Sequence, residues 1–152
     1  MAAVGNDLAT RLMENTHSCR GRIVAEVDVE RMRREARALA IHVGFARHDA
    51  EAIRLAVSEL ATNLVRYAPG GELVVSVVSE ANGVGILVQS SDPGPGIGDV
   101  ELALRDGYST SGGLGSGLPG IRRLMDDFTI VTSPSGTSIE ARKWLPSPSP
   151  SR

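Results

Sequence analysis

The chain has 152 residues, of which 41% are hydrophobic and 22% are charged, which fits one globular domain and excludes two full domains or a wholly disordered regulator. Sixteen basic residues against eighteen acidic ones leave a formal charge of -2, so no broad positive surface is expected for nucleic acid. The single cysteine, Cys19, excludes an intrachain disulfide. No apolar run approaches the roughly 20 residues of a membrane span, and no secretory signal starts the chain. We therefore expect a cytoplasmic protein without a membrane partner.

The first third of the chain predicts one strand followed by two helices. Residues 21–27 are β-prone, and a helical pattern then runs from an Asp28 N-cap to Phe45. A second helix is predicted from an Asp49 N-cap to the stop at Pro69. The apolar spacing of this second helix is the most regular in the chain.

The middle of the chain predicts a hairpin and then a long loop. Residues 72–79 and 85–90 are β-rich, and the Asn-Gly pair between them favours a hairpin turn. Prolines and glycines interrupt any long period from 91 to 120, apart from a short helix expected at 100–104. A loop of this length inside a compact domain usually has a function.

The end of the chain predicts a helix at 118–127 and two strands, at 128–133 and 137–144. This order of elements predicts an α+β protein, a two-layer α/β sandwich with helices on one face of a mixed, mostly antiparallel sheet. The domain is expected to span 21–145, between an N-terminal extension, 1–20, and a disordered tail, 146–152.

A carboxylate and an amide lie on one face of the second predicted helix. Glu59 and Asn63 are four residues apart, so they stack one turn apart, beside the core stripe and in line with Ala52 and Ala56. The small alanines are expected to leave room for something else to approach. The carboxylate could hold a proton in transit, and the amide oxygen could bind Mg²⁺. A solvated polar face is the alternative explanation.

A second cluster, DPGPGI at 92–97, directly follows the predicted hairpin. Its two prolines fix φ and its two glycines remove side chains, so the backbone can pass close to a flat ligand beside an acid at a strand end. Asp92 is suited to accept a hydrogen bond from an exocyclic amine. An ordinary proline-glycine turn explains the same residues without a ligand.

A third cluster, STSGGLGSGLPG at 109–120, leads into the third predicted helix. Glycine-rich backbone before a helix N-terminus offers unpaired N–H donors to a polyphosphate. The segment is neither a Rossmann motif, since polar loop rather than a strand precedes it, nor a Walker A motif, since no Lys-Ser or Lys-Thr follows. Arg105, Arg122 and Arg123 are possible helpers, and a flexible linker is the alternative explanation.

Taken in order, the three clusters resemble the GHKL ATP-binding fold shared by gyrase, Hsp90, histidine kinases and MutL. The segment ELATN at 59–63 looks like its N-box, 92–97 like its first glycine box, and GLGSGL at 113–118 like its second. Gly136-Thr137 resembles the GT element that closes the adenine pocket. The chain is too short for the transducer domains of gyrase, Hsp90 or MutL, and its histidines lack the flanking residues of a phosphoacceptor.

The resemblance implies ATP and Mg²⁺ as cofactors and assigns a role to each matching residue. It implies that Glu59 orients or deprotonates the attacking hydroxyl of a protein substrate and that Asn63 coordinates the Mg²⁺ that bridges the ATP phosphates. Asp92 would accept from the adenine amino group, and Thr137 would support adenine through a hydrogen bond. The remaining glycine-box residues would surround the nucleotide: Gly94, Gly96, Ile97, Gly113, Leu114, Gly115, Ser116, Gly117 and Leu118.

Two longer segments, 106–128 and 136–144, are very similar to the RsbT-type switch kinases, relatives of the bacterial anti-sigma kinases. The resemblance implies a serine/threonine protein kinase that phosphorylates a STAS-domain antagonist in a stressosome pathway and, when released, activates a PP2C-type phosphatase. One alternative is a kinase similar to RsbW or SpoIIAB that binds a sigma factor directly. Another is a non-catalytic module that binds a protein under ATP control. A homodimer is compatible with any of them.

Overall fold

The computed structural model describes residues 18–94 and 117–146. Within these ranges, no helix is long and apolar enough to cross a membrane. The elements, in chain order, are β1 (Ser18–Ile23), α2 (Glu26–Val43), α3 (Arg47–Tyr67), β2 (Gly71–Glu80), β3 (Gly83–Asp92), α5 (Gly117–Leu124), β4 (Asp127–Ser133) and β5 (Gly136–Trp144).

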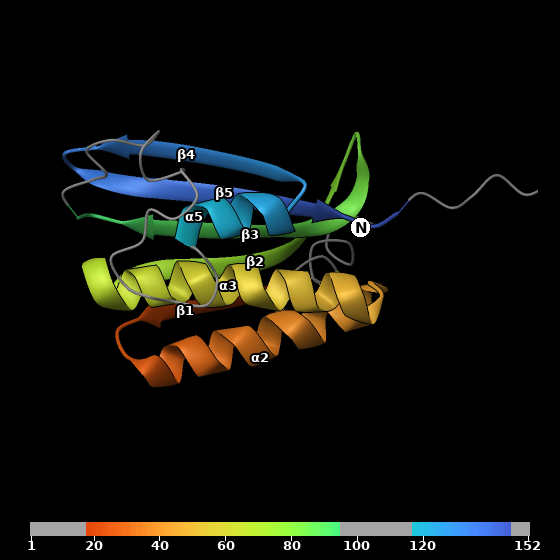
Figure 1. Cartoon of the computed structure of the whole chain (residues 1–152), viewed down its shortest axis with the longest axis horizontal. Helices are drawn as coiled ribbons and strands as arrows, with labels where there is room; N and C mark the ends of the chain where they lie inside the picture. Colours follow the sequence, from red (N-terminus) through yellow and green to blue (C-terminus); the bar gives the residue numbers. More distant parts are fainter. Residues whose placement is uncertain (1–17, 95–116, 147–152) are drawn as a thin grey trace, which may run out of the picture.

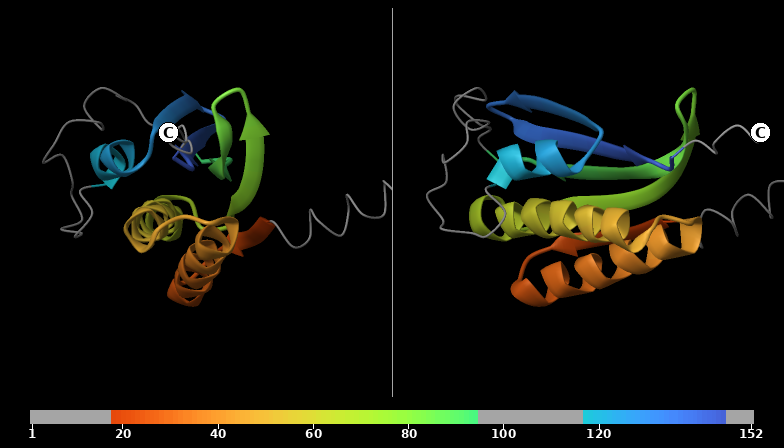
Figure 2. Two further views of the ribbon diagram at one scale, coloured as in Figure 1. Left: turned by 90° about the vertical axis from the view of Figure 1, so that its right-hand side faces the viewer. Right: turned by 45° about the vertical axis from the view of Figure 1, so that its right-hand side comes forward.

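The strands form one sheet in the order β1-β2-β3-β5-β4, and each neighbouring pair is antiparallel. Helices α2, α3 and α5 cover the same face of this sheet, with α3 between the other two (Figures 1 and 2). The predicted two-layer α+β sandwich is therefore confirmed. The described strands are wholly antiparallel, where a partly mixed sheet was expected.

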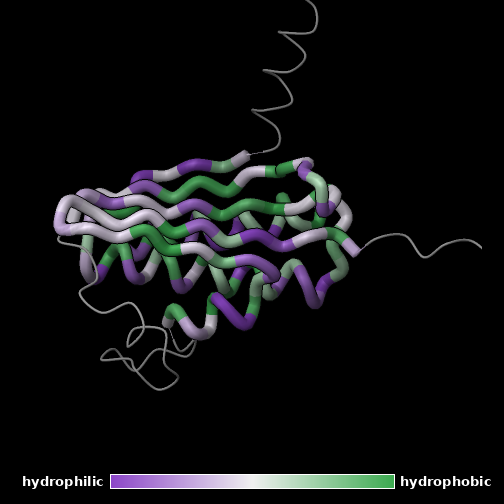
Figure 3. The backbone as a smooth tube through the Cα atoms, turned by 90° about the horizontal axis from the view of Figure 1, so that it is seen from above, coloured by the Kyte–Doolittle hydropathy of each residue, from purple (hydrophilic) through white to green (hydrophobic). Residues whose placement is uncertain are grey.

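The core lies between the sheet and the helices. Side chains alternate between the two faces of each strand, so every second residue of β2 and β3 points toward the helices, and the strands change between hydrophilic and hydrophobic along their length (Figure 3). On α3 the buried residues recur every three or four positions, which makes one apolar stripe. The largest fully buried side chains are Ile23, Met32, Ile53, Leu60, Leu73, Ile86, Ile121, Val29, Val57, Val75 and Val88.

Polar and charged side chains cover part of the sheet face opposite the helices. Arg142 on β5 donates to Glu80 on β2 and to its neighbour Glu140, at 3.3 Å each. The Trp144 ring lies against Gly85, where an added Cβ would stand 2.7 Å from a ring carbon. Among the described residues, this face therefore carries a polar network and the flat ring of Trp144.

The two aspartates predicted as N-caps lie within the first turn of their helices rather than before it. Asp28 is the third residue of α2 and Asp49 is the third residue of α3. Asp28 nevertheless contributes to capping, because its Oδ2 accepts hydrogen bonds from the N–H groups of Val24 and Ala25, at 3.0 Å each. Carboxylates are favoured both at the N-cap and throughout the first turn, which is why the sequence pattern did not separate the two positions.

Other boundaries also differ from the prediction, and α5 ends at Leu124 rather than at 127 because Asp127 already pairs with β5 as part of β4. Strand β1 begins at Ser18 rather than residue 21, because residues 18–20 pair with β2, and it ends at Ile23. Helix α2 stops before Gly44, whose φ of 117° closes the helix in the left-handed region. The β2–β3 hairpin pairs Glu80 with Gly83, so the strands are longer than predicted. The helix expected at 100–104 lies outside the described residues.

We predict that Asp28→Ala destabilises the fold in a pH-dependent way. The backbone hydrogen bonds from Val24 and Ala25 lower the pKa of Asp28 below its ordinary value of 3.8. A lowered pKa stabilises the fold above the ordinary pKa, and that contribution is lost as the pH falls through the lowered value. In urea unfolding, the variant should have a lower midpoint than the parent near pH 7, and the difference between the midpoints should narrow as the pH falls below 3.8.

Glu26→Ala, which removes another carboxylate from the same turn, is the control for a general effect of charge. A gap between Asp28→Ala and the parent that stays constant over this pH range would contradict the assigned role.

Candidate functional site

Helix α3 holds Glu59 and Asn63 on one face, beside the buried Leu60 and Leu64. Both polar side chains are partly buried, and their Cα atoms are separated by about 6 Å along the helix axis. They are therefore neither fully solvated nor part of the apolar core. The helix presents a carboxylate and an amide at successive turns of the same face, as the spacing predicted.

The room expected beside Ala52 and Ala56 is filled by protein. Ala56 is fully buried and Ala52 is 9% exposed. Helix α5 packs along α3 on the side away from α2 (Figure 2). The small residues therefore allow close packing of the fold around the first half of α3, and what approaches them is protein.

Asp92 and Thr137 lie directly opposite each other on neighbouring strands. Asp92 is the last residue of β3, and it pairs with Thr137 at the start of β5. Both side chains point toward the helix layer, because they continue the alternation that points Val88 and Ala141 into the core. A carboxylate acceptor and a hydroxyl group thus stand side by side at one end of the sheet.

The end of α3 packs against this strand end. A Cβ at Gly71 would stand 2.6 Å from Leu64 Cδ2 and 3.2 Å from Asp92 Cβ, so the helix side chain and the aspartate are neighbours. A Cβ at Gly94 would stand 3.7 Å from Ala68 Cβ and 2.8 Å from Asp92 Oδ1. These contacts bring the last turns of α3, which include Asn63, to the end of the sheet that carries Asp92.

A backbone turn fixes the carboxylate of Asp92. Its Oδ1 accepts a hydrogen bond of 2.8 Å from the N–H of Gly94, so one oxygen is used within the DPG turn. Gly136 passes so close to the carbonyl oxygen of Asp92 that a Cβ at Gly136 would collide with it. Because these glycines have no side chain, three backbone segments can lie close to the aspartate.

Thr132 is a polar residue of this site that the sequence analysis missed. It lies on β4 opposite Thr137, and the two Oγ1 atoms are 2.9 Å apart, where either can donate. Thr137 is 8% exposed, so its hydroxyl depends on such a partner. The two-residue turn at 134–135 sets the pairing of β4 with β5, and this register could have identified Thr132.

Only part of the glycine-rich region is described. Gly94 and Gly117 lie in it, and Gly117 opens α5 with a φ of 63°, which glycine adopts readily. Leu118 is 7% exposed and packs in the core. Arg122 and Arg123 are exposed on α5. The predicted site residues that lie outside the described residues are Gly96, Ile97, Gly113, Leu114, Gly115 and Ser116.

The donor set at this end suits a nucleotide better than an all-protein metal site. Within 18–94 and 117–146, no group of three or more His, Cys, Asp or Glu side chains could hold a metal ion. Mg²⁺ is typically held by one or two protein oxygens together with substrate phosphates. Asn63 could supply such an oxygen, and Asp92 with Thr137 could bind a base that offers an amino group. The residues present therefore fit ATP with Mg²⁺.

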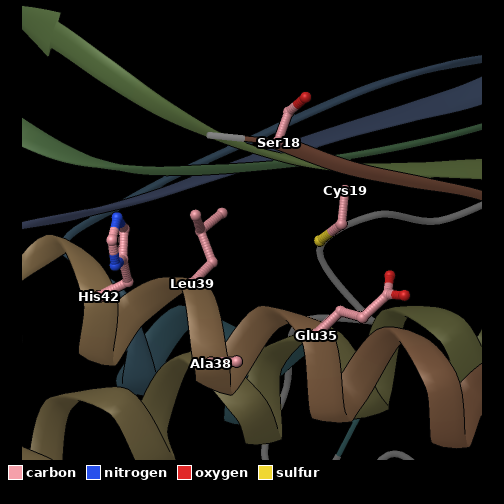
Figure 4. A pocket seen from close by; sticks show the side chains of 6 residues that line it. All are labelled: Ser18, Cys19, Glu35, Ala38, Leu39 and His42. Carbon is pink, nitrogen blue, oxygen red and sulfur yellow. The ribbon is translucent and has the colours of Figure 1, made fainter. Parts of the chain in front are cut away.

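A separate hollow of about 390 Å³ lies between β1 and α2. Figure 4 shows Cys19 directed toward α2, near Glu35, with His42 at the other end. Burial and the neighbouring Glu35 carboxylate raise the pKa of the Cys19 thiol to about 11, so the thiol stays protonated near neutral pH. The Cys19 thiol is therefore a weak nucleophile, and the hollow is distinct from the Asp92 end of the sheet.

Comparison with known proteins shows which family of domains this chain matches. Residues 24–143 match the family described as the histidine kinase-like ATPase domain. The chain is 42% identical over 132 residues to the serine/threonine-protein kinase RsbT of Bacillus subtilis, and the match covers 86% of this chain and 98% of RsbT.

A solved structure shows the same fold at lower identity. The RsbU and RsbW domains of Rv1364c from Mycobacterium tuberculosis match with a TM-score of 0.58 and 17% identity, over 83% of this chain and 32% of that one. The histidine kinase domain of a blue-light activated kinase from Erythrobacter litoralis matches with a TM-score of 0.46 and 20% identity, over 76% of this chain and 63% of that one. The first of these two matches shows that the fold is shared.

Proposed function

Because the chain belongs to the histidine kinase-like ATPase domain family, as an RsbT-type serine/threonine protein kinase, we propose that it transfers the γ-phosphate of ATP to a serine or threonine of a STAS-domain protein. The observation that supports this most strongly is the placement of Asp92 and Thr137 against the end of the helix that carries Glu59 and Asn63. A base-binding pair and a pair suited to phosphate chemistry thus lie at one end of the fold.

Adenine recognition is assigned to Asp92 and Thr137. The turn uses Oδ1 of Asp92, which leaves Oδ2 to accept from the adenine amino group. The hydroxyl of Thr137 exchanges a hydrogen bond with Thr132, so it is held in place before nucleotide binds. This arrangement favours adenine over a base that presents a carbonyl oxygen at the same position.

Phosphate transfer is assigned to Asn63 and Glu59. The Asn63 amide oxygen would hold Mg²⁺, which when bound neutralises charge on the phosphates. Glu59 would accept the proton of the substrate hydroxyl while the hydroxyl oxygen forms a bond to the γ-phosphorus and the bond to the ADP oxygen breaks. Phosphoryl transfer depends mainly on positioning and charge stabilisation, so this set is sufficient without a P-loop lysine.

The proposed setting is a partner-switching stress pathway in the cytoplasm. The STAS-domain antagonist would bind the kinase until it is phosphorylated, and the released kinase would then activate a PP2C-type phosphatase. The 42% identity to RsbT over most of the chain supports this choice over a kinase that binds a sigma factor directly.

Intact-mass measurement tests the proposal. Incubating the chain with a STAS-domain partner, ATP and Mg²⁺ should add one phosphate to the partner, with a chelator of Mg²⁺ as the control. Pull-down of a sigma factor rather than of the STAS-domain partner would favour a direct anti-sigma kinase. Regulation of a partner by ATP without any transfer would favour a non-catalytic binding module.

A further inference from the structure

Lys143 is a nearly buried cation at the far end of α5. It lies on β5 and points toward the helix layer, because it continues the alternation that buries Ile139 and Ala141. Its side chain is 13% exposed. The Nζ donates a hydrogen bond of 2.9 Å to the carbonyl oxygen of Leu124, the last residue of α5.

Two carboxylates flank the same ammonium group. Asp49 Oδ1, in the first turn of α3, and Asp126 Oδ1, just after α5, each lie 3.9 Å from the Nζ. A nearly buried ammonium needs such partners, and a cation at a helix C-terminus is favoured by the unpaired carbonyls and the helix dipole. Lys143 therefore joins α5, α3 and β5 through one charged group.

Asp126 is itself attached to β5 on both sides. Its Oδ2 accepts a hydrogen bond of 2.8 Å from the N–H of Trp144, and its own N–H donates one of 2.8 Å to the carbonyl oxygen of Arg142. The segment that follows α5 thus has little freedom to move along the sheet. We call the set Asp49, Asp126 and Lys143 the α5 clamp.

We propose that Lys143 is a positioning residue for nucleotide binding, which acts by fixing the far end of α5. The helix has eight residues, so it is a rod of about 12 Å, and a tilt at its last residue displaces its first. That first residue is Gly117, and the first turn of α5 lies toward the end of the sheet where β3 ends (Figure 1). The inference rests on the proposed function only for the location of the nucleotide.

A positioning role differs from a merely stabilising one in what it changes. Loss of stability alone lowers the folded fraction and leaves the affinity of the folded protein for ATP unchanged. Loss of helix position weakens ATP binding in protein that remains folded. The dissociation constant for ATP, measured well below the melting temperature, separates the two.

The test compares Lys143→Met with Arg142→Met. Both changes remove a cation from β5, but Arg142 pairs with Glu80 and Glu140 on the opposite face of the sheet, away from α5. In calorimetric titration, Lys143→Met should raise the dissociation constant for ATP roughly 5- to 30-fold, while Arg142→Met changes it less than about twofold. Lys143→Arg, which keeps the charge, should recover part of the affinity.

Equal ATP affinity in Lys143→Met and the parent, or an equal loss in Arg142→Met, overturns the inference. If Lys143→Met does not fold, Asp49→Asn removes one carboxylate of the clamp and should raise the same constant by a smaller factor; no change there also overturns it. These titrations contain no protein substrate, so a parent chain that binds ATP but transfers no phosphate contradicts the kinase proposal alone.

Discussion

Replacing Glu59 with glutamine should lower kcat for phosphate transfer to the protein substrate by about 10²- to 10⁴-fold, the range in which general bases contribute. The amide has nearly the same shape as the carboxylate but cannot take the proton of the attacking hydroxyl. Since Glu59 is assigned neither to adenine binding nor to Mg²⁺ binding, the affinity for ATP should change little. Single-turnover transfer of labelled phosphate measures the first effect, and titration with ATP measures the second.

Glu51→Gln is the matched control, because it makes the same change on the same helix. Glu51 pairs with Arg37 at 2.6 Å and Arg54 at 2.8 Å, two turns before Glu59. Transfer by this variant should stay within a few-fold of the parent. If Glu59→Gln retained more than half of the parent rate of transfer, or if Glu51→Gln lowered that rate as much as Glu59→Gln does, Glu59 would not be the general base.

Replacing Asp92 with asparagine should weaken ATP binding by roughly 10- to 100-fold, the effect of losing a hydrogen bond to a charged group at a partly buried site. Asparagine can keep the oxygen that accepts from the N–H of Gly94, so the turn should persist. Its NH₂ group would then face the amino group of adenine, donor against donor. The same NH₂ would suit the carbonyl oxygen of guanine, so the preference for ATP over GTP should fall.

Glu72→Gln is the control for this variant. Glu72 lies on the neighbouring strand at the same end of the sheet, but it is exposed and pairs with Arg20 at 3.4 Å on the face away from the helices. Its replacement should leave both ATP affinity and base preference unchanged. An Asp92→Asn variant with unchanged affinity for ATP would remove Asp92 from the adenine site.

The sequence predicted the fold well because its patterns are local. Helical spacing identified α2 and α3, and the Asn-Gly pair identified the β2–β3 hairpin, whose strands the structure extends to Glu80 and Gly83. The start of β1 was missed because Ser18 and Cys19 are neither β-branched nor aromatic, so no strand pattern marks them, and they are held by pairing with β2. The helix starts were shifted because an aspartate is favourable at either position of the first turn.

The sequence predicted the candidate site only where its residues lie within a single motif. The pairing of Asp92 with Thr137 depends on the register of β3 with β5, between which some forty residues of chain intervene, so no local pattern specifies it. Ala52 and Ala56 show that the size of a side chain does not by itself say what lies beside it. Their small size is equally consistent with an open site and with a close helix contact, and the position of α5 decided between these possibilities.

A crystal structure of the chain with ADP and Mg²⁺ tests the central claim most directly. We predict that the adenine amino group lies about 3 Å from a carboxylate oxygen of Asp92 and that the Asn63 amide oxygen coordinates the metal beside the phosphates. Adenine bound away from Asp92 and Thr137, or a metal bound without Asn63, would contradict the proposed site.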